Sequence, residues 1–205
     1  MTILEHPLIA DRLTSLRNKD SSSQEFRSFL HNIATLMVAE VTADLETTVQ
    51  GVETPIEETE GRRLSMSVVL VPILRAGLAL AEGFLTAIPE AKVAHIGIRR
   101  NHATLKPEVY YPNPPVDFAN SNTIVPDPML ATGGTAIETI RILKEQGAKR
   151  LIFACVIAAP EGLHALQLAH PDLPINVAAV DRCLDENGYI CPGLGDAGDR
   201  SFGTA

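Results

Sequence analysis

Short runs of apolar residues alternate along the chain with segments in which apolar residues recur every three or four positions. The runs are rich in valine and isoleucine, as in strands of a parallel sheet that is buried on both faces. They cover residues 68–71, 92–98, 123–125, 150–158 and 175–180. The helical spacing covers residues 26–45, 78–88, 136–147 and 161–170. This alternation predicts an α/β fold with a doubly wound, mainly parallel sheet, flanking helices and right-handed crossovers.

The N-terminal residues, about 6–45, are predicted to form helices. A short amphipathic element begins near His6, and a second helix is predicted to start at Ser22, where Glu25 completes the spacing of a capping box. The second helix carries an apolar stripe formed by Phe26, Phe29, Leu30, Ile33, Leu36, Met37 and Val41. Such a stripe is typical of a core or a subunit contact. Its extent favours a homodimer or a larger homo-oligomer.

The remaining segments are less regular. Residues 49–56 could add a short strand, and the charged residues 57–63 are interpreted as a solvated connection. Residues 108–115 are polar and rich in proline, which suits a hairpin, a mobile flap over a site or an ordinary surface loop. His164 and His170 are expected on the polar face of a helix, without a catalytic role.

Composition sets the class of protein. The 205 residues are enough for one domain, 1–205, and the formal net charge of −8 argues against non-specific binding to nucleic acid. No apolar run reaches the length of a membrane span, and the first residues lack the pattern of a signal peptide. A cytoplasmic protein without nucleic-acid or membrane partners is therefore expected. Cys155, Cys183 and Cys191 lack the spacing of a metal site and are interpreted as free thiols, the first in the core.

The stretch with the strongest chemical signal follows the strand at 123–125. Asp127 is expected at the tip of that strand, before a glycine- and threonine-rich turn at 132–135 and a helix. Free backbone N–H groups at a helix N-terminus attract anions, and glycine lets a phosphate approach the backbone closely. No lysine follows the glycines as in a Walker loop, so the acidic residue is a candidate for binding ribose hydroxyls or a metal-bound sugar. A turn of this composition alone is more often an ordinary strand-to-helix connection.

Three longer strings change that interpretation. Residues 127–135 resemble the phosphoribosyl pyrophosphate (PRPP) motif of the uracil phosphoribosyltransferases. Residues 188–200, with 202–204, resemble the uracil-binding segment of that family, and residues 72–78 are similar to its pyrophosphate loop. The resemblance runs from about residue 6 to residue 204, with the motifs in the order of the family.

The resemblance implies a type I phosphoribosyltransferase fold and a pyrimidine-salvage reaction in which uracil and PRPP give UMP and diphosphate. Arg75, Arg100 and Asp127 are the implied catalytic residues. The implied PRPP contacts are Arg75, Arg100, Asp127, Pro128, Met129, Leu130, Ala131, Thr132, Gly133, Gly134, Thr135 and Asp196. The implied uracil contacts are Ile190, Gly195, Asp196 and Ala197. Mg²⁺ would be bound mainly through PRPP, without assigned side-chain ligands, and a guanine nucleotide effector is a candidate partner because some relatives have one.

The chain also departs from the family pattern. His102 and Ala103 replace two acidic residues, and Pro126 replaces an aliphatic residue before the aspartate. These departures leave open a catalytically degenerate nucleotide sensor or RNA-binding regulator, although the uracil segment and the acidic charge count against it. A transferase for a purine or for orotate is the other alternative, and the C-terminal string counts against that. No general base stands out, and Asp196 is a candidate for that role.

Overall fold

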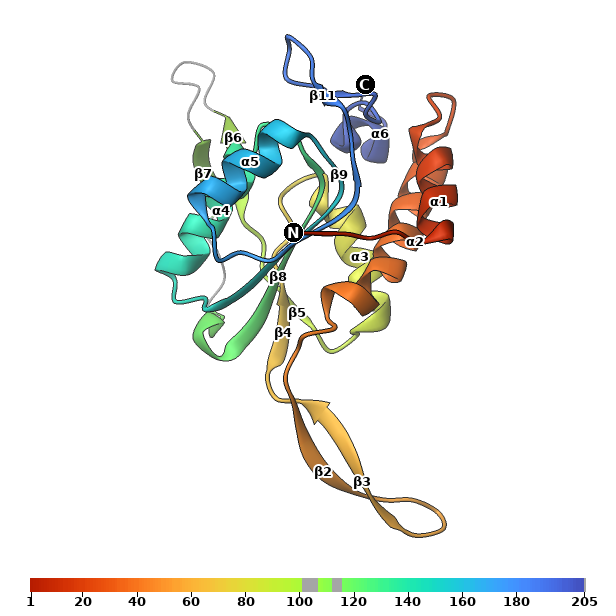
Figure 1. Cartoon of the computed structure of the whole chain (residues 1–205), viewed down its shortest axis with the longest axis vertical. Helices are drawn as coiled ribbons and strands as arrows, with labels where there is room; N and C mark the ends of the chain where they lie inside the picture. The colour runs from red at the N-terminus through yellow and green to blue at the C-terminus, as the bar shows by residue number, and fades with distance from the viewer. Residues whose placement is uncertain (101–106, 112–115, 205) are drawn as a thin grey trace.

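The computed structural model describes residues 1–100, 107–111 and 116–204 (Figure 1). Its centre is a six-stranded sheet in the order β1-β10-β9-β8-β4-β5, in which all neighbouring strands are parallel. The strands are β1 (Thr2–Ile3), β4 (Ser67–Leu70), β5 (Lys92–Val93), β8 (Ser121–Leu130), β9 (Arg150–Ala158) and β10 (Ile175–Val180). The predicted doubly wound sheet is confirmed, and β9 and β10 have the bounds of the apolar runs at 150–158 and 175–180.

Helices cover both faces of the sheet. On one face lie α4 (Gly134–Glu145) and α5 (Pro160–Ala169), and on the other lie α1 (Pro7–Arg17), α2 (Ser23–Val41) and α3 (Gly77–Ala87) (Figure 1). Each face has its own cluster of buried apolar residues, in agreement with strands that are buried on both sides.

Helix α2 begins with the capping box that the sequence predicts. Ser22 accepts a hydrogen bond from the Glu25 N–H, and the Glu25 carboxylate accepts one from the Ser22 N–H. The apolar stripe of α2 is buried within the chain itself, with Phe26, Ile33 and Met37 fully enclosed. The stripe is therefore part of the core, so its extent no longer supports association between chains.

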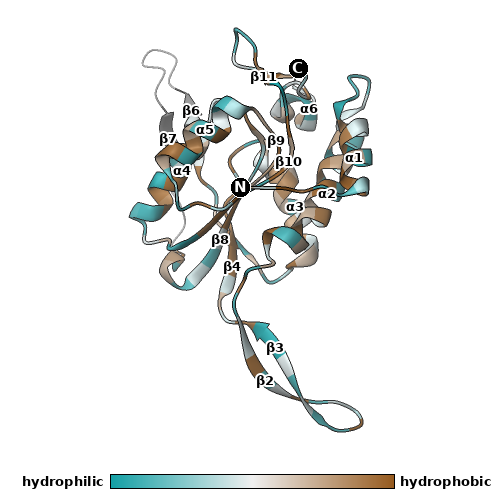
Figure 2. Cartoon of the chain, in the orientation of Figure 1, coloured by the Kyte–Doolittle hydropathy of each residue, from teal (hydrophilic) through white to brown (hydrophobic). Residues whose placement is uncertain are grey.

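A two-stranded arm extends away from the sheet. It consists of β2 (Thr47–Glu53) and β3 (Glu58–Leu64), which pair antiparallel along their whole length (Figure 1). The interpretation of residues 57–63 as a mere solvated connection is therefore wrong. Nearly every residue of both strands is exposed. Because neither strand has a buried face, the sequence shows no alternation of apolar and polar positions there. Figure 2 shows hydrophilic and hydrophobic segments interspersed along this arm.

Two short strand pairs, one short helix and one 3₁₀ turn complete the described structure. Strands β6 (Gly97–Arg100) and β7 (Pro107–Tyr111) form a second antiparallel pair, so the single strand expected at 92–98 is divided between β5 and β6. Part of the predicted hairpin at 108–115 thus lies in β7, and residues 112–115 are outside the described residues. Near the C-terminus, β11 (Cys183–Leu184) pairs with β12 (Ile190–Cys191), and α6 (Ala197–Phe202) follows. A single 3₁₀ turn, η1 (Phe118–Asn120), leads into β8.

Candidate functional site

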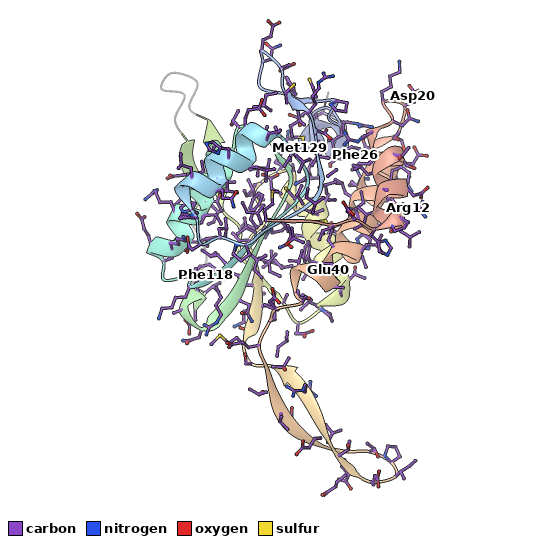
Figure 3. The ribbon with its side chains drawn as sticks, in the orientation of Figure 1. Arg12, Asp20, Phe26, Glu40, Phe118 and Met129 are labelled. Atoms are coloured by element: carbon purple, nitrogen blue, oxygen red, sulfur yellow. The ribbon has the colours of Figure 1, made fainter. Side chains whose placement is uncertain are left out.

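The three family-like segments meet at the carboxyl ends of β4 and β8. In open parallel sheets this edge is where ligands bind. Arg75, in the loop after β4, lies 3.2 Å from the Asp199 carboxylate in the C-terminal segment. A Cβ atom at Gly188 would lie 3.7 Å from the Thr132 methyl group in the loop after β8. Figure 3 shows Met129 at the end of the sheet near α6 and Phe118 at the opposite end, which places the site at the Met129 end.

Asp127 does not lie at the tip of its strand, because β8 continues to Leu130. The side chain is half-buried, and its Oδ1 accepts a 3.4 Å hydrogen bond from the Met129 N–H. Burial raises the pKa of Asp127 to about 7, and the Met129 hydrogen bond opposes this shift only weakly. No cation among the described residues compensates for this burial. A carboxyl group in this position lies near the ligand-binding edge of the sheet, with no cation among the described residues to pair with it. Such a group can accept hydrogen bonds from sugar hydroxyls.

Two prolines flank Asp127 within a central strand, a position that proline usually avoids. Side chains and backbone groups alternate along a strand, so Pro126 and Pro128 direct their backbone toward the same neighbour. That neighbour is β4, which pairs with β8 only as far as Ile124. The missing N–H groups therefore fall beyond the end of β4, where the Ile73 N–H donates to the Pro126 carbonyl. The departure at Pro126 leaves the strand intact.

The loop between β8 and α4 leaves room for an anion. Gly133 has a φ of 83°, a left-handed conformation that favours glycine, and no side chain caps the first turn of α4. The N–H groups of that first turn have no partner within the helix. A Cβ atom at Gly134 would meet only the Thr132 hydroxyl, at 3.9 Å, whereas one at Gly133 would meet the Gly162 carbonyl at 3.0 Å. The free space thus lies over Gly134, next to the positive end of the helix dipole.

Arg75 is held by the C-terminal segment. Its guanidinium donates to the Asp199 carboxylate and lies 5.8 Å from the centre of the Phe202 ring. The side chain is about half exposed, at 55%. The guanidinium can therefore turn from Asp199 to an anionic ligand without being pulled out of a core. The side chain of Arg100, together with His102 and Ala103, lies outside the described residues.

The C-terminal segment presents mainly backbone to the site edge. Within the described part of the chain, no hydrogen bond uses the amide N–H of Gly195, Asp196 or Ala197. The Asp196 side chain caps α6 by accepting a 2.9 Å hydrogen bond from the Asp199 N–H. Ala197 is fully buried, so its methyl group packs into the core. Ile190 is buried in β12.

The sequence prediction missed the polar side chains that hold this segment. Arg17, Arg27 and Asp181, which lie outside the segment, form hydrogen bonds to or from it, and Arg200 within the segment donates to its Leu194 carbonyl. Their partners are mostly carbonyl groups far away in the chain, and sequence spacing carries no signal for such contacts. Conversely, His170 is buried and not on a polar face, because its Nε2 lies 3.0 Å from the Ile137 carbonyl. His164 is exposed, as expected.

The described residues contain no cluster of three or more His, Cys, Asp or Glu side chains placed to bind a metal ion. In the described helices, no segment combines the length and the hydrophobicity needed to cross a membrane.

Sequence comparison matches residues 3–204 to the family described as uracil phosphoribosyltransferase. A uracil phosphoribosyltransferase of Dictyoglomus turgidum is 51% identical over 203 residues, which are 98% of both chains. One of Anoxybacillus flavithermus is 49% identical over 98% of this chain and 97% of the relative.

Comparison with solved structures agrees. The AQ2163 protein of Aquifex aeolicus superimposes with a TM-score of 0.93 and 36% identity, over 100% of this chain and 98% of that one. A purine phosphoribosyltransferase of Pyrococcus horikoshii shares the fold, with a TM-score of 0.52, 17% identity, and coverage of 74% and 83%. Together, the full-length sequence match and the meeting of the three motifs at one sheet edge establish that the chain belongs to the uracil phosphoribosyltransferase family.

Proposed function

We propose that residues 72–78, 127–135 and 188–204 form the site at which this chain carries out the reaction of its family. That reaction transfers the phosphoribosyl group of PRPP to uracil, giving UMP and diphosphate in pyrimidine salvage. The observation that carries the proposal is the convergence of these segments at the carboxyl ends of β4 and β8. Arg75 contacts Asp199 there, and Gly188 lies beside Thr132.

The reaction breaks the bond between the anomeric carbon and diphosphate, and positive charge develops on the ribose. No protein nucleophile is needed, since holding the two substrates in line and stabilising the leaving group can supply the acceleration. In this proposal the turn at 132–135 binds the 5′-phosphate through backbone N–H groups. Asp127 accepts hydrogen bonds from the ribose hydroxyls, and Arg75 exchanges Asp199 for the diphosphate, with Arg100 as a second cation.

A magnesium ion is proposed as part of the PRPP complex. Mg²⁺ keeps several waters and is usually bound by one or two carboxylates together with substrate phosphates. Asp127 is a carboxylate that could face such a complex, and the donor set of the described residues offers no protein cage. The ion would neutralise charge on the departing diphosphate.

Backbone groups are proposed to recognise the base. Uracil offers two carbonyl acceptors on either side of one N–H donor. The amide N–H groups of Gly195, Asp196 and Ala197 have no partner among the described residues and can supply donors, and Ile190 lies next to them in the site by resemblance. Because the Asp196 side chain caps α6, its backbone and not its carboxylate is the better candidate for contact with the base.

Further partners are also proposals. A second copy of the chain is the proposed partner of the exposed β2–β3 arm, and a guanine nucleotide is the proposed effector, by resemblance. A cytoplasmic location fits a salvage enzyme that uses nucleotide-pool substrates. Turnover with and without GTP tests the effector.

Label exchange between uracil and UMP tests the function directly. With purified protein and Mg²⁺, labelled uracil should enter UMP only when diphosphate is present, because the reverse reaction must first form PRPP. Exchange that needs no diphosphate would indicate a different reaction. Hydrogen exchange with bound UMP tests the site, since residues 188–204 and 127–135 should both become protected.

A further inference from the structure

The proposed base-binding segment is attached to the N-terminal helices by a partly buried ion pair. Arg17, the last residue of α1, donates from Nη1 and Nη2 to the two carboxylate oxygens of Asp181, at 2.8 and 2.5 Å. Asp181 directly follows β10 and is only 8% exposed. A bidentate contact of this kind fixes the orientation of both planar groups. The pair thus joins α1 rigidly to the edge of the sheet.

The same pair takes up both polar backbone groups of Gly193. Arg17 Nη1 donates to the Gly193 carbonyl at 2.7 Å, and the Gly193 N–H donates to Asp181 Oδ2 at 2.9 Å. Gly193 has a φ of 65°, and a Cβ atom there would lie 2.1 Å from the Ile190 carbonyl. The chain therefore turns tightly at Gly193, and the ion pair holds that turn from both sides. Gly195, the first of the three residues whose amide groups are proposed to bind uracil, follows two residues later in the chain.

A second set of contacts holds the following residues. Arg200 Nη1 donates to the Leu194 carbonyl at 2.8 Å and to the Leu16 carbonyl, in α1, at 2.9 Å. Its guanidinium lies 4.4 Å from the centre of the Phe26 ring, in α2. The turn at Gly193–Leu194 is thus attached to α1. Helix α6, which follows the turn in the chain, is attached to α1 and α2 through Arg200. Between these anchors lie the amide groups of Gly195, Asp196 and Ala197.

We propose that Arg17 and Asp181 are positioning residues for uracil. They do not touch the base, but they hold the Gly193 turn so that the amide groups of Gly195, Asp196 and Ala197 face uracil in one fixed geometry. A displacement of about 1 Å at a recognition site can lower a rate on the order of a hundredfold. The inference rests on the proposed base site, and it makes the N-terminal helices part of the uracil specificity of the enzyme.

The proposal predicts different effects on the use of the two substrates, uracil and PRPP. Among the described residues, all hydrogen bonds of the Arg17 guanidinium go to Asp181 and Gly193, and none goes to residues 127–135. Arg75 contacts this segment only in α6, at Asp199 and Phe202, and Arg200 holds α6 independently of the Arg17–Asp181 pair. Loosening the pair should therefore weaken the use of uracil and leave the use of PRPP almost unchanged. A purely structural role would lower the thermal stability and change the kinetics for both substrates or for neither.

Arg17→Lys is the main variant, because lysine keeps the charge but cannot form the bidentate contact and the Gly193 contact together. Asp181→Asn is the second variant, and it keeps the shape of the side chain. In folded Arg17→Lys, we expect the KM for uracil to rise about tenfold or more, with the KM for PRPP within about twofold of wild type. Asp172→Asn is the control, since it breaks an exposed ion pair with Lys144 and should change neither KM.

Circular dichroism first establishes that each variant is folded. A folded Arg17→Lys enzyme with an unchanged KM for uracil, or with both KM values raised in parallel, would overturn the positioning role. Failure of the base site itself has a different signature. In that case UMP would not protect residues 188–204 from hydrogen exchange in the wild-type enzyme, whatever the variants do.

Discussion

At the scale of single residues, Asp127 is a proposed site residue whose burial lowers the free energy of unfolding of the chain. Its pKa is raised from 3.8 to about 7 by burial. As the pH rises above about 4, the unfolded chain loses this proton while the folded chain keeps it. The contribution of Asp127 to the free energy of unfolding therefore falls between about pH 4 and pH 7, and it stays low above that range.

Asp127→Asn should consequently stabilise the protein and impair its activity. One pKa unit corresponds to about 1.4 kcal/mol, and because Asp127 is only half-buried we expect a gain of about 1–3 kcal/mol at pH 8. The gain should be smaller at pH 5, where the folded wild type is still protonated. Urea unfolding at the two pH values measures this, with Asp44→Asn, at an exposed carboxylate, as control. Equal gains at both pH values would contradict the burial argument.

Gly134 tests the phosphate-binding turn. Its surroundings are open apart from the Thr132 hydroxyl, so valine can be accommodated by the fold while its methyl groups fill the proposed phosphate position. We expect Gly134→Val to keep its stability within about 1 kcal/mol of wild type and to lose PRPP affinity on the order of a hundredfold. Calorimetric titration with PRPP and Mg²⁺ measures this. Gly133 is less suitable, because its φ of 83° would strain any side chain.

Ala10→Val is the matched control for Gly134→Val, since it adds the same kind of branched side chain to an exposed helical position far from the turn. Its PRPP affinity should equal that of the wild type. Tight PRPP binding by folded Gly134→Val would show that the phosphate binds elsewhere.

Base selectivity should follow from the backbone groups of the C-terminal segment. Cytosine replaces one carbonyl of uracil by an amino group and the ring N–H by a bare nitrogen, so buried donors and acceptors would face like partners. Sites built on hydrogen bonds can reject such analogues by roughly 10⁴. We expect no useful turnover of cytosine, whereas 5-fluorouracil keeps the uracil edge and should react. A cytosine rate within about tenfold of the uracil rate would exclude backbone recognition.

Ala197→Leu is not a clean test of that selectivity. A larger side chain at this position would not act on the base by steric hindrance alone, because Ala197 is fully buried with its methyl group in the core. A leucine there would overpack the core at a cost of about 1–3 kcal/mol. The competition between substrates in the wild-type enzyme is therefore the better measurement.

At the scale of elements, the sequence predicted best what is buried in the central sheet and its helices. The bounds of β9 and β10 follow from continuous apolar runs, and α4 follows from its helical spacing between two glycines. Of the β2–β3 arm, the sequence indicated only a short strand at 49–56, which β2 confirms in part. Strand β3 was missed because the two strands pair with each other in solvent, and burial leaves no periodic pattern there. The short helix α6 was missed for a similar reason, since its six residues are held by Asp196 and by distant arginines.

The same argument holds for the candidate site. Motif resemblance indicated Asp127, Arg75 and the glycine turn, whose segments the fold brings together. The extension of β8 past Asp127 was not predictable, because prolines at 126 and 128 normally end a central strand. The strand tolerates these two prolines because β4 ends before it reaches them, so no ladder hydrogen bond from their backbone nitrogens is lost.

The capping box of α2 yields a stability prediction for an element. Ser22→Ala removes the acceptor for the Glu25 N–H and should cost about 1 kcal/mol, as for loss of an N-cap residue. For a chain of this size that corresponds to a fall of roughly 2–4 °C in Tm. Ser28→Ala, at an exposed position inside the same helix, is the control and should not lower the Tm. A Tm for Ser22→Ala equal to that of the control would mean that the cap contributes nothing.

At the scale of the whole molecule, the β2–β3 arm is the feature that one chain alone does not explain. A two-stranded hairpin is marginally stable in water by itself. Within the described part of the chain, no strand pairs with either outer edge of the arm, and Val49, Val52 and Ile56 on it are 58%, 41% and 93% exposed. Charged side chains on the same strands, among them Glu58 and Arg62, oppose indiscriminate aggregation. These properties favour a specific partner, and a second copy of the chain presents the required apolar and polar surface at equal concentration.

Shortening the arm tests this association. Thr47 and Leu64 are paired at its base, so residues 48–63 can be replaced by a short Gly-Ser turn without moving the ends of the sheet. Sedimentation at micromolar concentration should show a dimer or a larger species for the full chain, and a single chain for the shortened variant. Circular dichroism should show that the variant keeps its helices, because the arm lies outside both buried clusters. The idea fails if the full chain sediments as one copy, or if the shortened chain still associates as strongly, since association would then depend on another surface.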